Sequence, residues 1–122
     1  MKYDNFEDLP IWQLAREIVG DVYDLSKNYE ALSRDFGLKD QLQRAAISIM
    51  NNIAEGFDAG SNAEFVRFLG YSQRSCSEIM SLTYVLRDVY KIEKTTERLY
   101  DKMLDLRKQV KGFVKYLKSK KN

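Results

Sequence analysis

Few side chains in this sequence could do covalent or acid–base chemistry. The chain has no His, and its single cysteine, Cys76, has no second thiol with which to pair. Without His, neither a Ser/His/Asp nor a Cys/His nucleophile can form, and the commonest metal ligand is missing. There is also no glycine-rich phosphate loop. We therefore assign no catalytic, cofactor-binding or metal-binding residue, and we expect a protein that is not an enzyme and uses no cofactor.

Two carboxylates, Glu55 and Glu64, bracket the turn FDAGS and are the nearest approach to an acid–base pair. Glu55 stands at the end of a predicted helix, and Glu64 follows Ser61 by three residues, which is the spacing of a capping box. We interpret both carboxylates as helix-end residues. Cys76 lies among apolar residues at helical spacing, so we interpret it as a small packed side chain.

A row of basic and aromatic side chains is a stronger candidate for a binding surface. Arg67, Tyr71, Arg74 and Glu78 fall within about 60° of one another on a helix, away from its apolar side. Arginine can pair with phosphate, and tyrosine can stack on a base. The alternative is that Arg74 and Glu78 form an exposed ion pair and that Arg67 is only solvated.

The carboxyl end is basic although the net charge of the chain is only +2. No acid follows Asp105, and the bases of this end are Arg107, Lys108, Lys111, Lys115, Lys118, Lys120 and Lys121. The helix dipole accounts for part of this bias, because it favours cations in a last turn. The candidate nucleic-acid-binding residues are therefore Arg44, Arg67, Tyr71, Arg74, Lys111, Lys115 and Lys118.

The stretch from Leu38 to Phe57 has two faces of different chemistry. One is apolar, and the other, which we call the polar stripe, consists of Gln41, Arg44, Ser48, Asn52 and Glu55. Solvated helix faces are usually rich in Lys and Glu, so an amide- and hydroxyl-rich stripe indicates specific hydrogen bonds. The alternative is a polar face that simply meets water. We expect Gly56 to end this helix.

Four amphipathic helices should carry these residues, near 9–27, 36–56, 62–90 and 95–119. Asp8 is the expected N-cap of the first, with Pro10 in its first turn. The third should hold one apolar face through to Val89. The last has the clearest heptad pattern, with apolar residues at Leu99, Met103, Leu106, Val110, Phe113 and Leu117. Short connections place successive helices antiparallel, so we predict an all-α, up-down-up-down four-helix bundle.

The length of 122 residues fits one domain spanning 1–122. With 44% hydrophobic and 31% charged residues, the chain has the composition of a globular protein. No charged-then-apolar leader begins it, and no apolar run approaches the roughly 18 residues that could cross a membrane. We expect a cytoplasmic protein without membrane contact.

The central helix resembles a known family. Its pattern is similar to gL-x-x-Q-x-x-R-A-x-x-S-I-x-x-N-I-A-E-G, which is typical of the bacterial four-helix bundle proteins, also described as 23S rRNA intervening-sequence proteins. The matching residues are Gly37, Leu38, Gln41, Arg44, Ala45, Ser48, Ile49, Asn52, Ile53, Ala54, Glu55 and Gly56. Further matches lie before this helix at Phe6, Leu9 and Trp12, and after it at Glu64, Phe65, Phe68, Leu69, Ser75 and Glu78.

This resemblance implies a helical bundle that assembles into a ring, a pentamer, and a role that is poorly defined. It also implies a link to inserts in ribosomal RNA and a likeness to the accessory protein of diversity-generating retroelements. One departure counts against binding: many relatives carry a basic residue just after N-I-A-E-G, where this chain has Phe57, Asp58, Ala59 and Gly60. We expect that loop not to touch phosphate.

Apolar residues outside the main arcs predict a homo-oligomer. They are Ile47, Met50, Ala54, Val66 and Val85. Two functions remain open. One is electrostatic binding of RNA or DNA with little sequence preference, through the basic surfaces of a ring. The alternative is a structural or adaptor protein whose ring recruits a protein partner.

Overall fold

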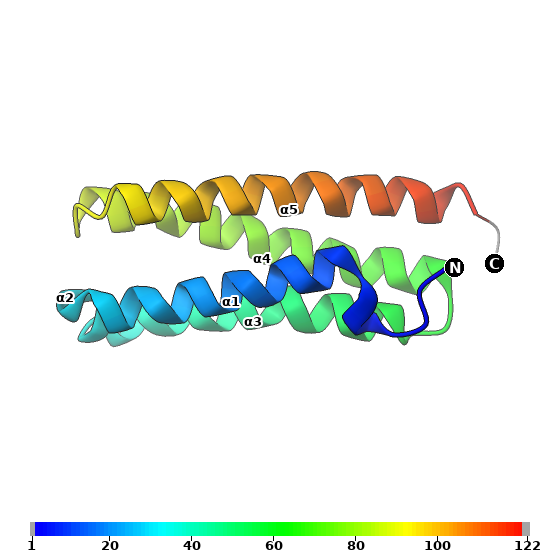
Figure 1. The fold of residues 1–122 in the computed structure, drawn as a ribbon, viewed down its shortest axis with the longest axis horizontal. Coiled ribbons are helices and arrows are strands. Elements are labelled where there is room, and N and C mark those ends of the chain that lie inside the picture. Colours follow the sequence, from blue (N-terminus) through cyan, green and yellow to red (C-terminus); the bar gives the residue numbers. More distant parts are fainter. Residues whose placement is uncertain (1, 121–122) are drawn as a thin grey trace.

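Four long helices lie side by side along the long axis of the molecule (Figure 1). The computed structural model describes residues 2–120. The long helices are α1 (Pro10–Asn28), α3 (Phe36–Phe57), α4 (Asn62–Asp88) and α5 (Lys94–Lys118). Each one packs on two neighbours, because α1 contacts α3 and α5, and α4 contacts the same two helices. Successive long helices run in opposite directions and no strand occurs in the described residues, so the predicted all-α four-helix bundle is confirmed.

The predicted helix ranges hold closely. The largest difference is at the end of α4, which stops at Asp88, two residues before the predicted residue 90. Val89 is therefore not part of the apolar face: it is the residue that follows the last turn, and it is 64% exposed. The predicted heptad residues of α5 do face the core, with Met103, Leu106 and Val110 fully buried.

The expected N-cap of the first helix was wrong. Asp8 belongs to a short 3₁₀ helix, η1 (Phe6–Asp8), and its carboxylate accepts a hydrogen bond from the backbone N–H of Asn5 at 3.3 Å. Leu9 then takes the N-cap position, without a capping side chain, and Pro10 occupies the first turn as predicted. The connection to α3 also contains an unpredicted single turn of helix, α2 (Glu30–Ser33).

Asp35 begins α3 and links it to the end of α4. One carboxylate oxygen accepts from the backbone N–H of Leu38 at 3.1 Å, and the other accepts from the hydroxyl of Tyr90 at 2.6 Å. The Tyr90 hydrogen bond, helped by that of Leu38, lowers the pKa of Asp35, and the same bond raises the pKa of Tyr90.

Gly56 does not end α3, contrary to the prediction. The helix continues through it to Phe57, and Gly60, with φ of 93°, supplies the left-handed backbone of the following turn. Gly56 is buried where α4 approaches. A Cβ atom placed there would lie 2.7 Å from Cδ1 of Phe65 and 2.9 Å from Cβ of Phe68. The glycine is therefore needed for close packing of two helices, not for a change of direction.

The core runs the length of the bundle and includes Cys76, which is fully buried between apolar neighbours. Burial raises the pKa of its thiol to about 12, because a thiolate would lose its hydration there. The interpretation of Cys76 as a packed small side chain is confirmed. No helix in residues 2–120 is long and apolar enough to cross a membrane, and the same residues contain no cluster of acids and thiols suited to a metal ion.

Candidate nucleic-acid interface

Arg67 on α4 is held in place by its own helix. Its guanidinium forms two hydrogen bonds with the carboxylate of Glu64, at 2.7 and 3.0 Å, and donates to the hydroxyl of Tyr71 at 2.7 Å. The Glu64 bonds raise the pKa of Arg67 further above its ordinary value and lower that of Glu64. Arg67 is therefore not merely solvated, and Glu64 offsets its charge. Ser61 caps α4 as expected, because its hydroxyl accepts from the backbone N–H of Glu64 at 3.1 Å, but the Glu64 carboxylate binds Arg67 and does not complete the predicted capping box.

Arg74 has a different environment from Arg67. Its guanidinium lies 5.7 Å from the centre of the Tyr71 ring, a cation–π distance. The predicted ion pair between Arg74 and Glu78 is not formed, and Arg74 has no acidic partner in the described part of the chain. Its charge therefore remains available on the exposed side of α4.

The polar stripe of α3 divides into a bonded middle and exposed ends. Ser48 accepts from the hydroxyl of Ser75 on α4 at 3.0 Å, and Asn52 donates to the Ser48 hydroxyl at 3.0 Å and to its carbonyl at 2.8 Å. Beside them, Ser72 donates to the carbonyl of Ile49 at 3.0 Å. The interpretation of this stripe as a face that meets only water is thus wrong at its middle, where the groups join α3 to α4.

The ends of the stripe remain at the surface. Gln41, Arg44 and Glu55 are exposed. The guanidinium of Arg44 lies 3.6 Å from the carboxylate of Asp40, and both side chains are more than 60% exposed, so their ion pair contributes little. Arg44, Asp40 and Glu78 border one polar groove between α3 and α4. Two acids beside one base do not favour a phosphate there.

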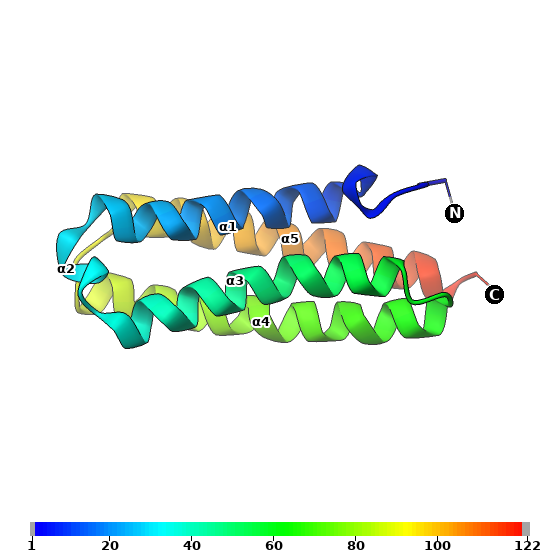
Figure 2. The same ribbon diagram turned by 90° about the horizontal axis from the view of Figure 1, so that it is seen from below.

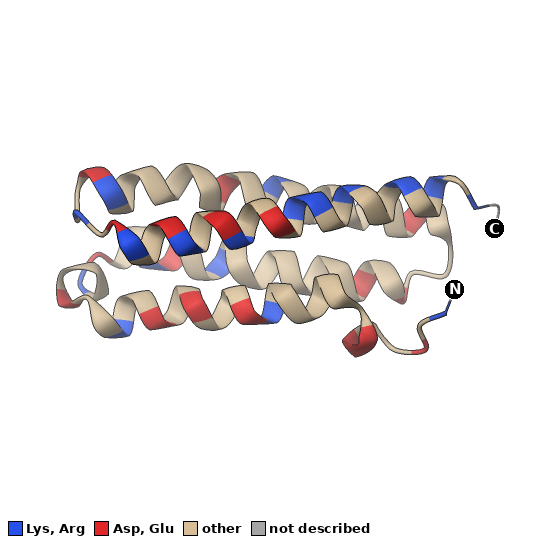
Figure 3. Cartoon of the chain, turned by 45° about the horizontal axis from the view of Figure 1, so that its top comes forward, with Lys and Arg blue, Asp and Glu red and all other residues tan. Residues whose placement is uncertain are grey.

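The carboxyl-terminal half of α5 carries the densest unpaired positive charge. Figure 3 shows basic residues without acids along this half of the helix. Lys108, Lys111, Lys115, Lys118 and Lys120 are exposed. None of them forms an ion pair within residues 2–120. Lys121, the last base of this end, lies outside the described residues.

The geometry of this lysine row suits an extended anion. Because an α-helix rises 1.5 Å per residue, Lys108 and Lys118 are about 15 Å apart along the axis. Duplex DNA carries one phosphate per strand about every 3.4 Å along its axis. The row runs toward the end of the bundle where α4 begins (Figure 1). Lys118 and Lys120 border a hollow there with Val66 of α4. Arg67 adjoins this end, and Arg44 does not, so the structure does not gather all the predicted binding residues into one surface.

A comparison with models of known protein families shows which family the chain belongs to. The model of the 23S rRNA-intervening sequence protein family matches residues 7–112. The chain belongs to this family. The matched range contains the polar stripe and the residues Arg67, Tyr71 and Arg74 of α4, whereas Lys115 and Lys118 lie beyond it. No curated protein and no solved structure matches the chain.

Sequence reasoning missed the partners of the site residues. It placed Arg67 and Ser48 on the right faces, but it did not pair Arg67 with Glu64 or Ser48 with Ser75. The spacing of Glu64 and Arg67 was a usable signal, because residues three apart lie on the same side of a helix. No local signal could have joined Ser48 to Ser75, since they are 27 residues apart.

Proposed function

We propose that this chain binds RNA or DNA electrostatically, with little sequence preference, through the lysine row of α5. The observation that supports this is four exposed lysines on one half-helix, with Lys120 just after it, and no acid to offset them. Lysine is a point charge with three donors and no fixed fork, so it suits phosphate better than base edges. Arg74 is a secondary contact, and the ion-paired Arg67 and Arg44 contribute less.

A homo-oligomer would strengthen such binding. Not all of the apolar residues on which we predicted an oligomer are free to contact another subunit. Met50 and Val66 pack against the core of their own chain. Val85 remains exposed, and Val89 lies exposed one turn beyond it, so these two residues are the apolar surface that we propose for self-association. A ring, with a pentamer as the expected form, would repeat the lysine row around an axis and raise avidity without new contacts. Sedimentation equilibrium giving only monomer at tens of micromolar would contradict the oligomer.

The salt dependence of binding tests the proposal. We expect affinity for a fluorescent duplex of about 25 base pairs to fall with a log–log salt slope of roughly −4 to −5, which corresponds to about five neutralised phosphates. Replacing Lys111, Lys115 and Lys118 by Gln should flatten this slope by roughly 2 to 3, and Arg74→Gln should flatten it by less than about 1. Anisotropy titrations at several salt concentrations measure both.

A charge-matched control separates location from total charge. Lys27, Lys91 and Lys94 are exposed and lie toward the opposite end of the bundle, so their replacement by Gln should leave the slope unchanged. Equal loss in both triple variants would place the binding elsewhere. If the assembled protein binds neither RNA nor DNA at ~50 mM salt, the adaptor function becomes the better proposal.

A further inference from the structure

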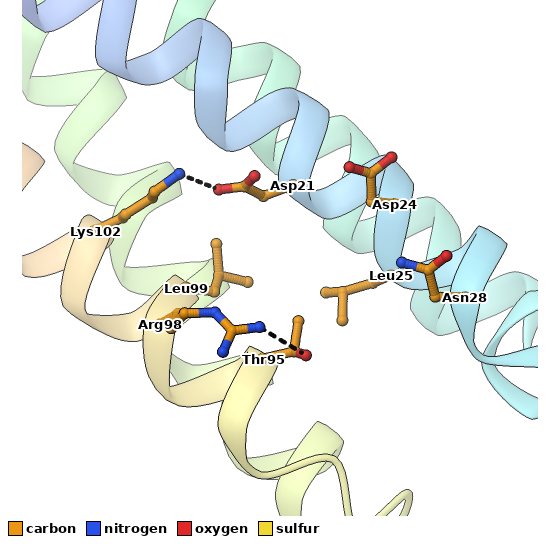
Figure 4. Close-up of a pocket in the computed structure, with 8 residues that line it drawn as sticks. All are labelled: Asp21, Asp24, Leu25, Asn28, Thr95, Arg98, Leu99 and Lys102. Carbon is orange, nitrogen blue, oxygen red and sulfur yellow. Dashed lines mark hydrogen bonds and ion pairs between the residues drawn. The ribbon is translucent and has the colours of Figure 1, made fainter.

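The helix α5 borders two hollows that differ in charge. Between its first turns and the end of α1 lies a groove of about 250 Å³ over Leu25 and Leu99, where Lys102 donates to Asp21 at 2.7 Å (Figure 4). Two acids, Asp21 and Asp24, line this groove. The other hollow, of about 290 Å³, lies beside the carboxyl-terminal turns of α5, and no acid of the described residues lines it. The second hollow therefore suits a polyanion better than the first.

This second hollow, which we call the aromatic hollow, has one face of α5 as a wall. The four wall residues are three, one and three positions apart, a spacing that places them on one side of a helix. They are Gln109, Gly112, Phe113 and Tyr116. The rest of the lining comes from Tyr3 and from residues 9–11, where α1 begins. Pockets for drug-sized ligands hold roughly 300–1,000 Å³, so the aromatic hollow suits a single planar ring system.

The rings of the aromatic hollow are held by packing on the core. Phe113 packs edge-on against the buried Phe65, with ring centres 5.3 Å apart and planes at 77°. Tyr116 lies nearly parallel to Phe113, with ring centres 5.9 Å apart and planes at 13°, and Tyr116 is 42% exposed. Both rings, with Tyr3, also border a neighbouring hollow beside Lys2. Rings that are fixed and partly open provide a platform on which a planar base can stack.

Two cations accompany these rings. The ammonium of Lys2 lies 5.7 Å from the centre of the Tyr3 ring, and that of Lys120 lies 5.2 Å from the centre of the Tyr116 ring. Both lysines are exposed, and neither forms an ion pair within residues 2–120. They can therefore turn from the rings to a phosphate without leaving an acid unpaired.

Gly112 keeps part of the aromatic hollow free of side chains. A Cβ atom at Gly112 would meet no atom within 4 Å. This differs from Gly56, where the side chains of α4 fill the space beside the glycine. A larger side chain at Gly112 would therefore extend into the aromatic hollow without disturbing the packing of the bundle.

The lysine row borders the aromatic hollow. With 3.6 residues per turn, Lys108 and Lys115 lie about 40° and 60° from Gly112 around the axis of α5. A strand whose phosphates contact this row can therefore direct a base toward the wall of the hollow. Gln109 in that wall forms no hydrogen bond within the described residues, so its amide can donate to the edge of a base or accept from it.

We propose that the aromatic hollow stacks an unpaired base of a single strand whose phosphates lie on the lysine row. This inference rests on the proposed function, and it adds which part of the nucleic acid is recognised. The bases of a duplex are stacked on one another, so only an unpaired base can enter the hollow. Stacking accepts any base, because every base has a π-face, and the low sequence preference is retained.

An abasic strand separates stacking from phosphate binding. A strand of about ten deoxyadenosines and an abasic strand of the same length carry the same phosphates, and both can be labelled for anisotropy titrations at ~50 mM salt. We expect the adenine strand to bind at least about fivefold more tightly, the lower end of what one base–aromatic stack contributes. Equal affinities for the two strands would overturn this inference alone. Binding of neither strand would overturn the proposed function and this inference with it.

Two variants and two controls locate the stacked base. Gly112→Leu fills the aromatic hollow and Tyr116→Leu removes its most exposed ring, so each should reduce the preference for the adenine strand to less than about twofold. Neither should change the affinity for the abasic strand. Gly20→Leu and Tyr84→Leu make the same changes at exposed positions outside the hollow and should retain the full preference.

Circular dichroism confirms that all four variants remain folded. Full preference for the adenine strand in both Gly112→Leu and Tyr116→Leu would overturn the inference. Equal loss of preference in the two controls would also overturn it, because the stacked base would then lie elsewhere.

Discussion

The α3–α4 interface and the α1–α5 interface join their helices by opposite means. Between α3 and α4 the polar contacts are made by short hydroxyl side chains, since Ser72 and Ser75 on α4 bond directly to Ile49 and Ser48 on α3. Gly56 leaves room for Phe65 and Phe68 of α4 to pack directly on the backbone of α3. Figure 2 shows α3 and α4 alongside each other from the start of α3 to the turn that joins them.

Between α1 and α5 the polar contacts are made by long charged side chains. Lys102 reaches from α5 to Asp21 and Glu17, and Tyr29, just after α1, bonds the hydroxyl of Thr95 at 3.2 Å. Long side chains meet only at their tips, and the space beneath them is the groove above Leu25 and Leu99. Close packing through small residues fixes two helices together, while bridging by long charged side chains leaves a groove between them. Stability should therefore depend more on α3–α4 than on the polar contacts of α1–α5.

The largest expected effect comes from filling the space at Gly56. A Cβ there would overlap the Phe65 and Phe68 side chains, so Gly56→Ala should destabilise the protein by about 2–3 kcal/mol, the usual range for overpacking. Urea unfolding measures the change. Gly70→Ala is the control, since a Cβ at this exposed position of α4 meets no atom within 4 Å, and it should stabilise by roughly 0.5–1 kcal/mol.

A smaller loss is expected from the buried hydroxyl of Ser72. Ser72→Ala removes its hydrogen bond to the carbonyl of Ile49, which should cost about 1 kcal/mol in unfolding free energy. Ser77→Ala, at an exposed position of the same helix, should change stability by less than about 0.5 kcal/mol. Equal effects of the two substitutions would show that the hydrogen bond between helices contributes nothing.

The ion pairs of the α1–α5 interface should matter less. Lys102 is partly exposed, so Lys102→Met should destabilise by about 0.5 kcal/mol or less near neutral pH. The Asp21 hydrogen bond raises the pKa of Lys102 above its ordinary 10.5. The contribution is therefore complete below pH 10.5 and is lost as pH rises through the raised value. A loss above 2 kcal/mol in urea unfolding at pH 7 would contradict the ranking of the two interfaces.

The last effect is expected in a titration. Tyr90→Phe removes the main hydrogen bond that lowers the pKa of Asp35, so this pKa should rise toward its ordinary 3.8. In the native protein the Asp35 contribution to stability is present above pH 3.8 and is lost as pH falls through the lowered value. In the variant this contribution should be smaller, and its loss should end at a higher pH, because the native pKa of Asp35 lies closer to 3.8. NMR of the Asp35 carboxyl carbon measures the shift, and an identical titration in both proteins would exclude the Tyr90 contribution.

The helices and their buried faces could be predicted because each depends on residues close in the chain. The alternating spacing of four and three between Leu99 and Leu117 specifies a face whatever the partner is. The role of Gly56 could not be predicted, since a glycine near a helix end is also typical of a terminator. The Asp8 cap failed because Asn5 engaged its carboxylate first. Which backbone N–H the Asp8 carboxylate binds depends on the conformation of the residues before it, and the sequence pattern does not specify that conformation.

The candidate sites were predicted less completely than the fold. Periodicity placed Arg67 and Arg74 on an exposed side, but it did not distinguish a guanidinium held by Glu64 from one without an acid. The groove between α1 and α5 was not predicted at all. Its charges come from residues more than 70 positions apart, Asp24 and Arg98, and only the packing of the bundle brings them together.

Because Cys76 is buried, the rate at which its thiol is modified should report how often the core opens. A thiol with a pKa near 12 and no exposed surface is almost inert to alkylating reagents while the core stays closed. Modification then proceeds only during excursions that part α4 from its neighbours. With excess reagent, the labelling rate of the Cys76 sulfur equals the rate at which the core opens. No engineered probe is needed, because the chain has no other thiol.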